Sequence, residues 1–316
     1  MQILVTGAAG FLGRRLIEAL LEEPTGLPPI ARIIAADVTR CAIEDRRIAH
    51  RQGTIADVDF VHSIAEPDID VVYHLAAVLS GQSEAEFDTG MHVNVDATRT
   101  LLEACRRLPR PPRVVFASTV AVFGGEPRAT LSEDAVVRPQ SSYGTEKAIG
   151  ELLVSEYSRR GFIDGIACRV ATVAIRPGKP NSALSSFVSG IVREPLAGIA
   201  TVCPVPPDTR LWISSPRTVT ANLLHAARVP AAALEGQRVL NLPGLSVTPG
   251  EMLDSLRRLG GSEAHARVRV EIDERVAHVV CTWPGALDAS RAIRLGFMAD
   301  RNIDELVGEY ISEQRG

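Results

Sequence analysis

The sequence predicts an α/β fold built on a doubly wound parallel sheet, and three observations support this. Short apolar runs alternate with helical patterns through the first half of the chain. A glycine-rich turn, Thr6–Gly13, follows the first apolar run and precedes a helical pattern that begins at Arg14. An acidic residue, Asp37, follows the second apolar run. Together these features are typical of a Rossmann-like domain that binds a dinucleotide.

The individual elements follow from the apolar pattern. The first strand is predicted at residues 3–5, and further strands at 33–36, 71–75, 113–117 and 165–170. Helical spacing predicts helices at about 91–107, 141–160 and 182–194. A segment at 238–242 has the pattern of a strand that returns to the sheet. We therefore expect an NAD-binding domain over residues 1–173, joined by strand 238–242, and a smaller, mainly substrate-binding lobe over residues 174–316.

Composition restricts the class of protein. The 316 residues carry a net charge of −4, which argues against a nucleic-acid partner or an anionic membrane surface. No apolar run approaches the length needed to span a bilayer. The first strand starts so early that we expect no signal peptide and a cytoplasmic location. The five cysteines are widely spread, without Cys-x-x-Cys, and the histidines show no ligand spacing, so we predict neither disulfides nor a metal site.

The glycine turn and Asp37 predict the cofactor. Glycines allow the tight turn and the close backbone approach that a pyrophosphate needs, and the helix N-terminus offers unpaired N–H groups. The Asp37 carboxylate can accept both hydroxyls of the adenosine ribose and would repel a 2′-phosphate, which favours NAD over NADP. Arg40 lies nearby and leaves some tolerance for NADP open.

A tyrosine and a lysine are the candidates for the chemistry. Tyr143 and Lys147 are four residues apart, on one face of a predicted helix. An ammonium group and the positive nicotinamide ring would favour the phenolate of a tyrosine that is otherwise a poor base at neutral pH. Ser118 and Thr119 end a predicted parallel strand, whose carboxyl end faces the ligand crevice. A hydroxyl there can hold the substrate oxygen beside Tyr143.

These motifs resemble the extended short-chain dehydrogenase/reductases, the group of nucleotide-sugar epimerases and dehydratases. The resemblance extends from residue 1 to about residue 300. It rests on Thr6–Gly13, Asp37, His74–Ala77, Asn94, Ser118–Thr119, Val122–Gly124, Tyr143-x-x-x-Lys147, Arg176–Gly178, Asn241–Gly244 and Leu295–Phe297.

The resemblance implies a role for each matching residue. The catalytic set would be Thr119, Tyr143 and Lys147. The cofactor would be NAD, contacted by Gly7, Gly10, Phe11, Leu12, Gly13, Asp37, Thr54, Ile55, Leu75, Ala76, Ala77, Asn94, Tyr143, Lys147 and Val173. Asn94 would also support the lysine network, and the family usually has Asp where Thr54 stands. The family often forms dimers through the two helices at 91–107 and 141–160, so a homodimer is expected.

A narrower set of residues resembles NAD-dependent dehydrogenases of four-carbon sugar acids such as D-erythronate. This set includes Leu79–Gly81, Arg176–Asn181, Ser185–Phe187, Arg193–Gly198 and Leu242–Thr248. The arginine-containing pattern of the nucleotide-sugar enzymes is only half present at Arg210–Arg217. Three interpretations remain open: a sugar-acid dehydrogenase, a nucleotide-sugar epimerase or dehydratase in which Arg210 meets a phosphate, and a non-catalytic dinucleotide sensor.

For the dehydrogenase interpretation, the expected reaction oxidises the α-hydroxyl of a small sugar acid, D-erythronate to 2-dehydro-D-erythronate, with Tyr143 as base. A substrate carboxylate needs hydrogen-bond donors, preferably an arginine. The predicted substrate contacts are Ser80, Ser118, Thr119, Tyr143, Arg176, Asn181 and Ser185. His74 is expected to be a packed core histidine without a catalytic part.

Overall fold

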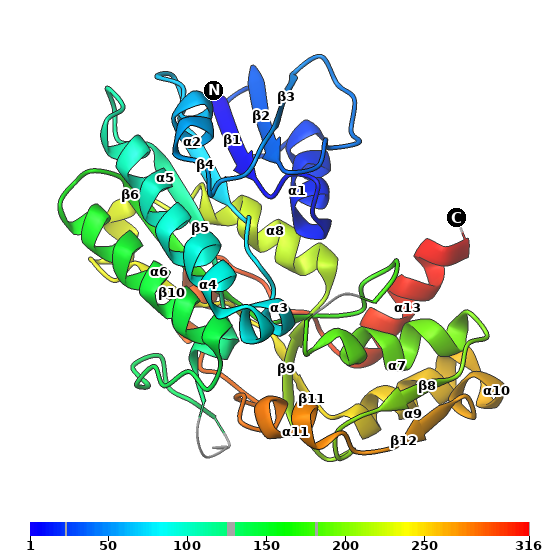
Figure 1. Ribbon diagram of the computed structural model, residues 1–316. Helices are drawn as coiled ribbons and strands as arrows, with labels where there is room; N and C mark the ends of the chain where they lie inside the picture. The colour runs from blue at the N-terminus through cyan, green and yellow to red at the C-terminus, as the bar shows by residue number, and fades with distance from the viewer. Residues whose placement is uncertain (23, 125–129, 181–182, 316) are drawn as a thin grey trace.

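A seven-stranded parallel sheet forms the centre of the protein (Figure 1). The computed structural model describes residues 1–22, 24–124, 130–180 and 183–315. The strand order is β10-β6-β5-β4-β1-β2-β3. The strands are β1 (Gln2–Thr6), β2 (Arg32–Asp37), β3 (Ile48–Gln52), β4 (Val71–His74), β5 (Arg113–Thr119), β6 (Asp164–Val170) and β10 (Val239–Asn241). The chain order reverses between β1 and β4, where an open α/β sheet has its ligand crevice.

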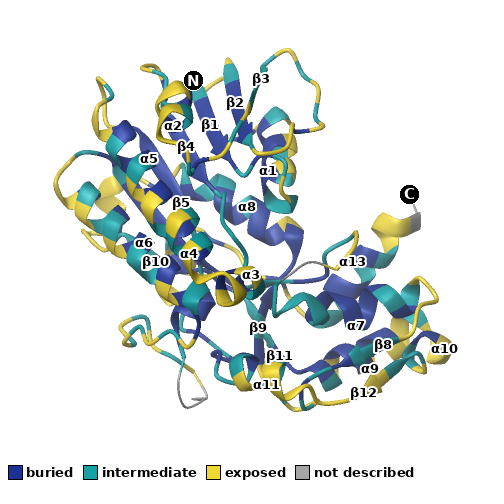
Figure 2. Ribbon diagram, viewed as in Figure 1, coloured by how far each residue is buried: buried dark blue, intermediate teal, exposed yellow. Residues whose placement is uncertain are grey.

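Helices cover both faces of the sheet because side chains alternate along each strand. Ile3 and Val5 pack with helices α1 (Phe11–Leu21) and α8 (Pro216–Ala226). Leu4 points to the other face, where the core includes α2 (Val58–Ile64), α5 (Ala97–Arg106) and α6 (Ser142–Arg159). Figure 2 shows the strands buried between these two layers. This confirms the predicted doubly wound fold.

A smaller lobe follows the sheet and has a hydrophobic core of its own. It holds a three-stranded sheet of β11 (Leu245–Val247), β9 (Leu211–Ser214) and β7 (Thr172–Val173), and a pair of β12 (Val268–Val270) with β8 (Thr201–Cys203). Its helices are α7 (Ser186–Leu196), α9 (Pro249–Gly260), α10 (Ser262–His265), α11 (Glu274–Val280) and α13 (Ile303–Arg315). Within the later part of the chain, β10 pairs in parallel with β6 and α12 (Ser290–Arg294) packs near it.

Several elements differ from the sequence prediction. Strand β3 was not predicted, because an edge strand that is half exposed lacks a continuous apolar run. Helix α7 begins and ends later than predicted and includes Pro195 in its last turn, where the missing N–H removes one helical hydrogen bond and the helix ends one residue later. The predicted helix at 91–107 begins as a π-helix, Met91–Asp96, before continuing as α5. Two short helices, α3 (Ser80–Ala85) and α4 (Phe87–Gly90), lead into it.

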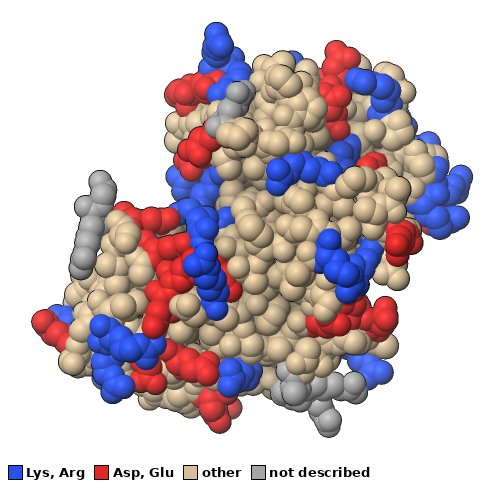
Figure 3. Space-filling view, turned by 180° about the vertical axis from the view of Figure 1, so that it is seen from behind, with Lys and Arg blue, Asp and Glu red and all other residues tan. Residues whose placement is uncertain are grey.

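The surface carries both signs of charge. Figure 3 shows Lys and Arg side chains interspersed with Asp and Glu on the face turned away from the view of Figure 1. Arg217, for example, pairs with Glu309 at 2.6 Å and Arg258 with Asp304 at 2.6 Å. No helix among the described residues is long and apolar enough to cross a membrane.

Candidate active site

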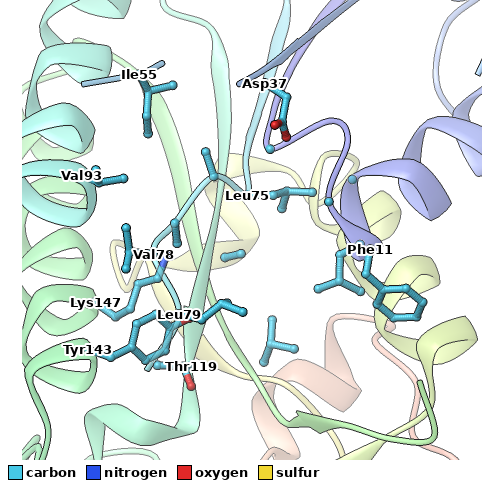
Figure 4. A pocket seen from close by; sticks show the side chains of 18 of the residues that line it. Phe11, Asp37, Ile55, Leu75, Val78, Leu79, Val93, Thr119, Tyr143 and Lys147 are labelled. Atoms are coloured by element: carbon cyan, nitrogen blue, oxygen red, sulfur yellow. The ribbon is translucent and has the colours of Figure 1, made fainter. Parts of the chain in front are cut away.

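A cavity of about 520 Å³ opens along the carboxyl ends of the central strands. In Figure 4 it extends from Asp37 and Phe11 to Thr119, Tyr143 and Lys147. Its lining comprises Gly7, Gly10, Phe11, Leu12, Gly13, Ala36, Asp37, Val38, Gly53, Thr54, Ile55, Leu75, Ala76, Ala77, Val78, Leu79, Val93, Ala117, Ser118, Thr119, Tyr143, Lys147, Val170, Ala171, Val173 and Arg176. The cavity therefore brings together most residues that the sequence singled out.

The glycine turn forms one wall by close backbone packing. Gly7 has a φ of +74°, and a Cβ there would lie 2.7 Å from the backbone nitrogen of Ala76. A Cβ on Gly13 would lie 2.0 Å from the carbonyl oxygen of Gly7. Only glycine fits at either position. Helix α1 then begins at Phe11 with no side-chain cap, so the N–H groups of its first turn remain available to a ligand.

Asp37 fixes the glycine turn and keeps capacity for a ligand. Its Oδ2 accepts from the Ala9 N–H at 3.0 Å, and its Oδ1 accepts from the Thr39 N–H at 3.0 Å. Each carboxylate oxygen can accept a second hydrogen bond. Arg40 instead pairs with Glu44 at 2.7 Å and lies exposed. Asp37 thus lies at the edge of the cavity with acceptor capacity left for a ligand.

The residues that line the cavity are chemically suited to a dinucleotide. Gly7 and Gly13 leave the space that a pyrophosphate needs, and the α1 N-terminus faces it with donors. Thr54 and Ile55 line the cavity near Asp37, and Leu75, Ala76 and Ala77 continue the wall toward Tyr143. Val173 lines it from the lobe side. The residues predicted to contact NAD line this cavity, with the exception of Asn94, which lies behind the wall.

Tyr143 and Thr119 meet because α6 packs closely on the turn after β5. A Cβ on Gly144 would lie 2.2 Å from the carbonyl oxygen of Ala121, so glycine lets the start of α6 approach that turn. Ser141 caps the helix by accepting from the Gly144 N–H at 3.2 Å. Thr119 Oγ1 accepts from the Ala121 N–H at 3.1 Å, which leaves its proton free to donate into the cavity. The three predicted catalytic residues share one end of the cavity (Figure 4).

The electrostatics of Tyr143 and Lys147 differ from expectation. Burial, followed by the negative charge of Glu146, raises the pKa of Tyr143 above its ordinary value. Burial lowers the pKa of Lys147 to about 8, although Glu146 and Glu151 oppose the shift. The Lys147 Nζ lies 4.7 Å from the Phe116 ring centre and 5.8 Å from that of Tyr143. In the protein alone, loss of solvation outweighs the neighbouring ammonium, and the phenol stays protonated at neutral pH.

Ser118 is hydrogen-bonded to a buried ion pair. Its hydroxyl donates to Glu151 Oε1 at 2.6 Å. Arg169 donates to both oxygens of Glu151 at 2.8 Å, and the side chains of the pair are 9% and 4% exposed. Ser118 lines the cavity, yet its proton is directed into the core. Its role is to tie the end of β5, which carries Thr119, to α6.

Of the other residues predicted to contact the substrate, only Arg176 lines the cavity among those that the structure describes. Arg176 lines the cavity, and burial followed by the charge of Arg193 lowers its pKa. Ser80 and Ser185 do not line it; Ser80 Oγ accepts from the Leu184 N–H at 3.1 Å. Asn181 lies outside the described residues.

Asn94 and His74 support the cavity from behind. Asn94 is 1% exposed, and its side chain bonds both the N–H and the carbonyl of Val78, at 2.8 and 3.0 Å. His74 is 1% exposed and lies between Thr6 and Thr98. Burial lowers the pKa of His74 to about 3, so it is neutral, which confirms its assignment to the core.

Sequence reasoning missed several apolar lining residues. Val78 and Leu79 directly follow the wall residues Leu75–Ala77, and Val38 directly follows Asp37. Their place next to strand ends was the signal that could have found them. Val93 and Val170 are brought in by packing between elements, which no local pattern indicates.

The chain matches proteins of known families over nearly its whole length. Residues 3–207 match the family described as NAD dependent epimerase/dehydratase family. The chain is 48% identical to D-erythronate dehydrogenase of Cupriavidus necator, over 99% of this chain and 98% of that protein. It is 40% identical to D-erythronate dehydrogenase of Haemophilus influenzae, over 98% and 99%.

Among solved structures, the nucleoside-diphosphate-sugar epimerase from Agrobacterium tumefaciens has a TM-score of 0.94 and 39% identity. That likeness covers 100% of this chain and 95% of the other. The resemblance drawn from the sequence, and with it the expectation of an NAD-dependent enzyme, is confirmed. The chain belongs to the NAD dependent epimerase/dehydratase family.

Proposed function

We propose that this protein oxidises the α-hydroxyl of a small sugar acid with NAD, converting D-erythronate to 2-dehydro-D-erythronate. The observation that carries the proposal is the shared cavity: it holds Thr119, Tyr143 and Lys147 at the end away from Asp37, and it also holds Arg176. The names of the two relatives at 48% and 40% identity support the substrate.

Each residue has one task in this reaction. Tyr143 takes the proton of the α-hydroxyl as general base. Thr119 donates its free proton to the same oxygen and orients it. The Lys147 ammonium favours the phenolate form of Tyr143 by its charge. When bound, NAD supplies the hydride acceptor and, in its oxidised form, a positively charged ring. That ring and Lys147 together must offset the burial that raises the pKa of Tyr143.

Arg176 is the proposed anchor for the substrate carboxylate. It is the arginine that lines the cavity among the described residues. Its position is fixed from behind, since its N–H donates to Ser189 Oγ at 3.0 Å and its carbonyl accepts from Arg193 at 2.9 Å. A guanidinium can bind a carboxylate through two parallel hydrogen bonds.

The test measures NADH formation at 340 nm with D-erythronate and NAD. Wild-type protein is expected to reduce NAD, and Tyr143→Phe to lose at least about 100-fold in kcat, because general base catalysis contributes that much. Tyr157→Phe is the matched control: this tyrosine lies on the same helix, but its hydroxyl bonds Glu103 on α5. Equal activity of Tyr143→Phe and wild type would refute the assignment of the base.

A nucleotide-sugar epimerase or dehydratase is the second candidate, favoured by the likeness to the Agrobacterium structure. Arg210, the residue proposed to meet a phosphate, does not line the cavity; it is 56% exposed and pairs with Glu251 at 3.3 Å. Turnover of a UDP- or GDP-sugar without net NADH release would support this second function over the first.

We also propose a homodimer formed through α5 and α6. The two helices lie side by side (Figure 1), and Leu152 on α6 is 72% exposed. Single exposed apolar side chains are common on protein surfaces, so the support for this interface is the family resemblance, and Leu152 provides the position at which to test it. Light scattering coupled to gel filtration should give a molar mass of twice the chain mass of 33.9 kDa. Leu152→Glu should lower the measured molar mass toward that of the monomer.

A further inference from the structure

Glu146 is a buried carboxylate for which the proposed reaction has no use. It precedes Lys147 on α6 and is 0% exposed. Its Oε2 accepts from Ser83 Oγ at 3.0 Å and from Asn94 Nδ2 at 2.6 Å. Its Oε1 is buried without a hydrogen-bond partner, and no ion pair within 4 Å involves Glu146 in the described part of the chain. A carboxylate in such a place is costly unless its charge is compensated.

The fold makes room for this carboxylate. A Cβ on Gly90 would lie 2.3 Å from Glu146 Oε1, so the glycine at the end of α4 leaves the necessary space. The π-helix that follows places Asn94 against Glu146. Asn94 also holds Val78, a lining residue of the cavity. Glu146 is thus joined through one side chain to the wall of the cofactor cavity.

Two donors hold the Glu146 carboxylate at Oε2. Ser83 Oγ accepts from Asn94 at 3.3 Å and donates its own proton to Glu146. The next residue after Glu146, Lys147, carries a positive charge. Lys147 is 2% exposed, and its ammonium lies over the Phe116 ring.

Few other charges act on Lys147. On α6, Glu151 acts on it but is already paired with Arg169 of β6. From β4, His74 faces it and is neutral. Glu84 on α3, Asp88 on α4, and His92 with Asp96 on the π-helix are exposed. Arg113 on β5 is buried and is paired with Asp164. Burial lowers the pKa of Lys147, and among the charges that oppose this shift Glu146 makes the largest contribution.

We propose that Glu146 is a positioning residue of the Tyr143–Lys147 pair: its buried carboxylate supplies a negative charge on the helix turn that carries Lys147, and its hydrogen bond to Asn94 fixes the cavity wall at Val78. The proposal rests on the proposed function for its catalytic meaning. The electrostatic part stands on the protein alone and is tested there.

The sequence makes a direct test possible, because Lys147 and Lys179 are the lysines of the chain. Protein labelled with ¹³Cε-lysine, in a Lys179→Arg background, gives the NMR titration of Lys147 by itself. Glu146→Gln keeps the shape and removes the charge. We expect it to lower the titration midpoint of Lys147 by roughly one pH unit or more, as loss of a nearby opposite charge does. Glu84→Gln removes an exposed carboxylate near the start of α6 and should leave the midpoint unchanged.

An unchanged midpoint in Glu146→Gln, with native chemical shifts, overturns the proposal. Should Glu146→Gln fail to fold, Glu146→Met removes the charge with an apolar side chain of similar length. The same downward shift is expected, and its absence also overturns the proposal. Glu146→Asp retains the charge and should bring the midpoint back toward the wild-type value.

The pH profile of kcat/KM for D-erythronate gives the catalytic readout. Because the charge of Glu146 raises the pKa of both Tyr143 and Lys147, Glu146→Gln should move both limbs of the profile to lower pH. If Glu146 had only a structural role, Glu146→Gln would lower the maximum kcat/KM and leave the pH values of the two limbs of the profile unchanged. Activity that persists in Tyr143→Phe would refute the proposed function while leaving the NMR result intact, so the two failures are distinguishable.

Discussion

Removing the Glu151 carboxylate should destabilise the protein far more than removing an exposed carboxylate of the same helix. Glu151 and Arg169 are 4% and 9% exposed and share two hydrogen bonds of 2.8 Å. Glu151→Gln leaves the Arg169 guanidinium buried without its countercharge. Breaking such a pair by removing one partner costs about 3–5 kcal/mol. The cost should appear as a lower free energy of unfolding in urea, followed by circular dichroism.

Glu156 on the same helix provides the matched control. It pairs with Arg159 at 2.8 Å, and these side chains are 50% and 69% exposed. Glu156→Gln should cost less than about 1 kcal/mol because water screens the pair. Ser118→Ala leaves the ion pair intact and should cost about 1 kcal/mol for one hydrogen bond. If Glu151→Gln cost no more than Glu156→Gln, the ion pair would not hold β5 against α6 as described.

Three further substitutions test the cavity. Asp37→Ala should raise the KM for NAD about tenfold or more, since a charge-assisted hydrogen bond contributes about 1.5–3 kcal/mol. It should also reduce the ratio of kcat/KM for NAD to kcat/KM for NADP. An unchanged ratio in steady-state kinetics would contradict this. Arg176→Gln should raise the KM for D-erythronate about tenfold or more with little change in kcat, and a fall in kcat alone would argue against a carboxylate anchor. Gly13→Ala places a Cβ 2.0 Å from the Gly7 carbonyl oxygen, so the turn must move; calorimetry should detect no NAD binding, and unaltered affinity would refute the packing argument.

The sequence predicted the parts of the site that depend on local chemistry. The glycine turn, Asp37 and the Tyr143–Lys147 spacing each imply a fixed geometry within a few residues, and the structure places all of them in one cavity. The strand with the weakest apolar pattern, β3, was missed because edge strands are half exposed.

Features that depend on tertiary packing could not be predicted. Ser80 and Ser185 were expected at the substrate, but neither lines the cavity, and Ser80 Oγ instead accepts from the Leu184 N–H. Asn94 lies behind the cavity wall, and Ser118, although it lines the cavity, directs its proton to Glu151. The pKa of Tyr143 is set by its burial, which the i, i+4 spacing to Lys147 does not reveal.

A crystal structure of the NAD complex tests the central claim most directly. Adenosine ribose hydroxyls within hydrogen-bond distance of Asp37, with the nicotinamide ring beside the hydroxyl of Tyr143 and the ammonium of Lys147, are the predicted result. The claim would be contradicted by a nicotinamide ring bound so far from Tyr143 that a substrate beside the ring could not pass its proton to the Tyr143 hydroxyl.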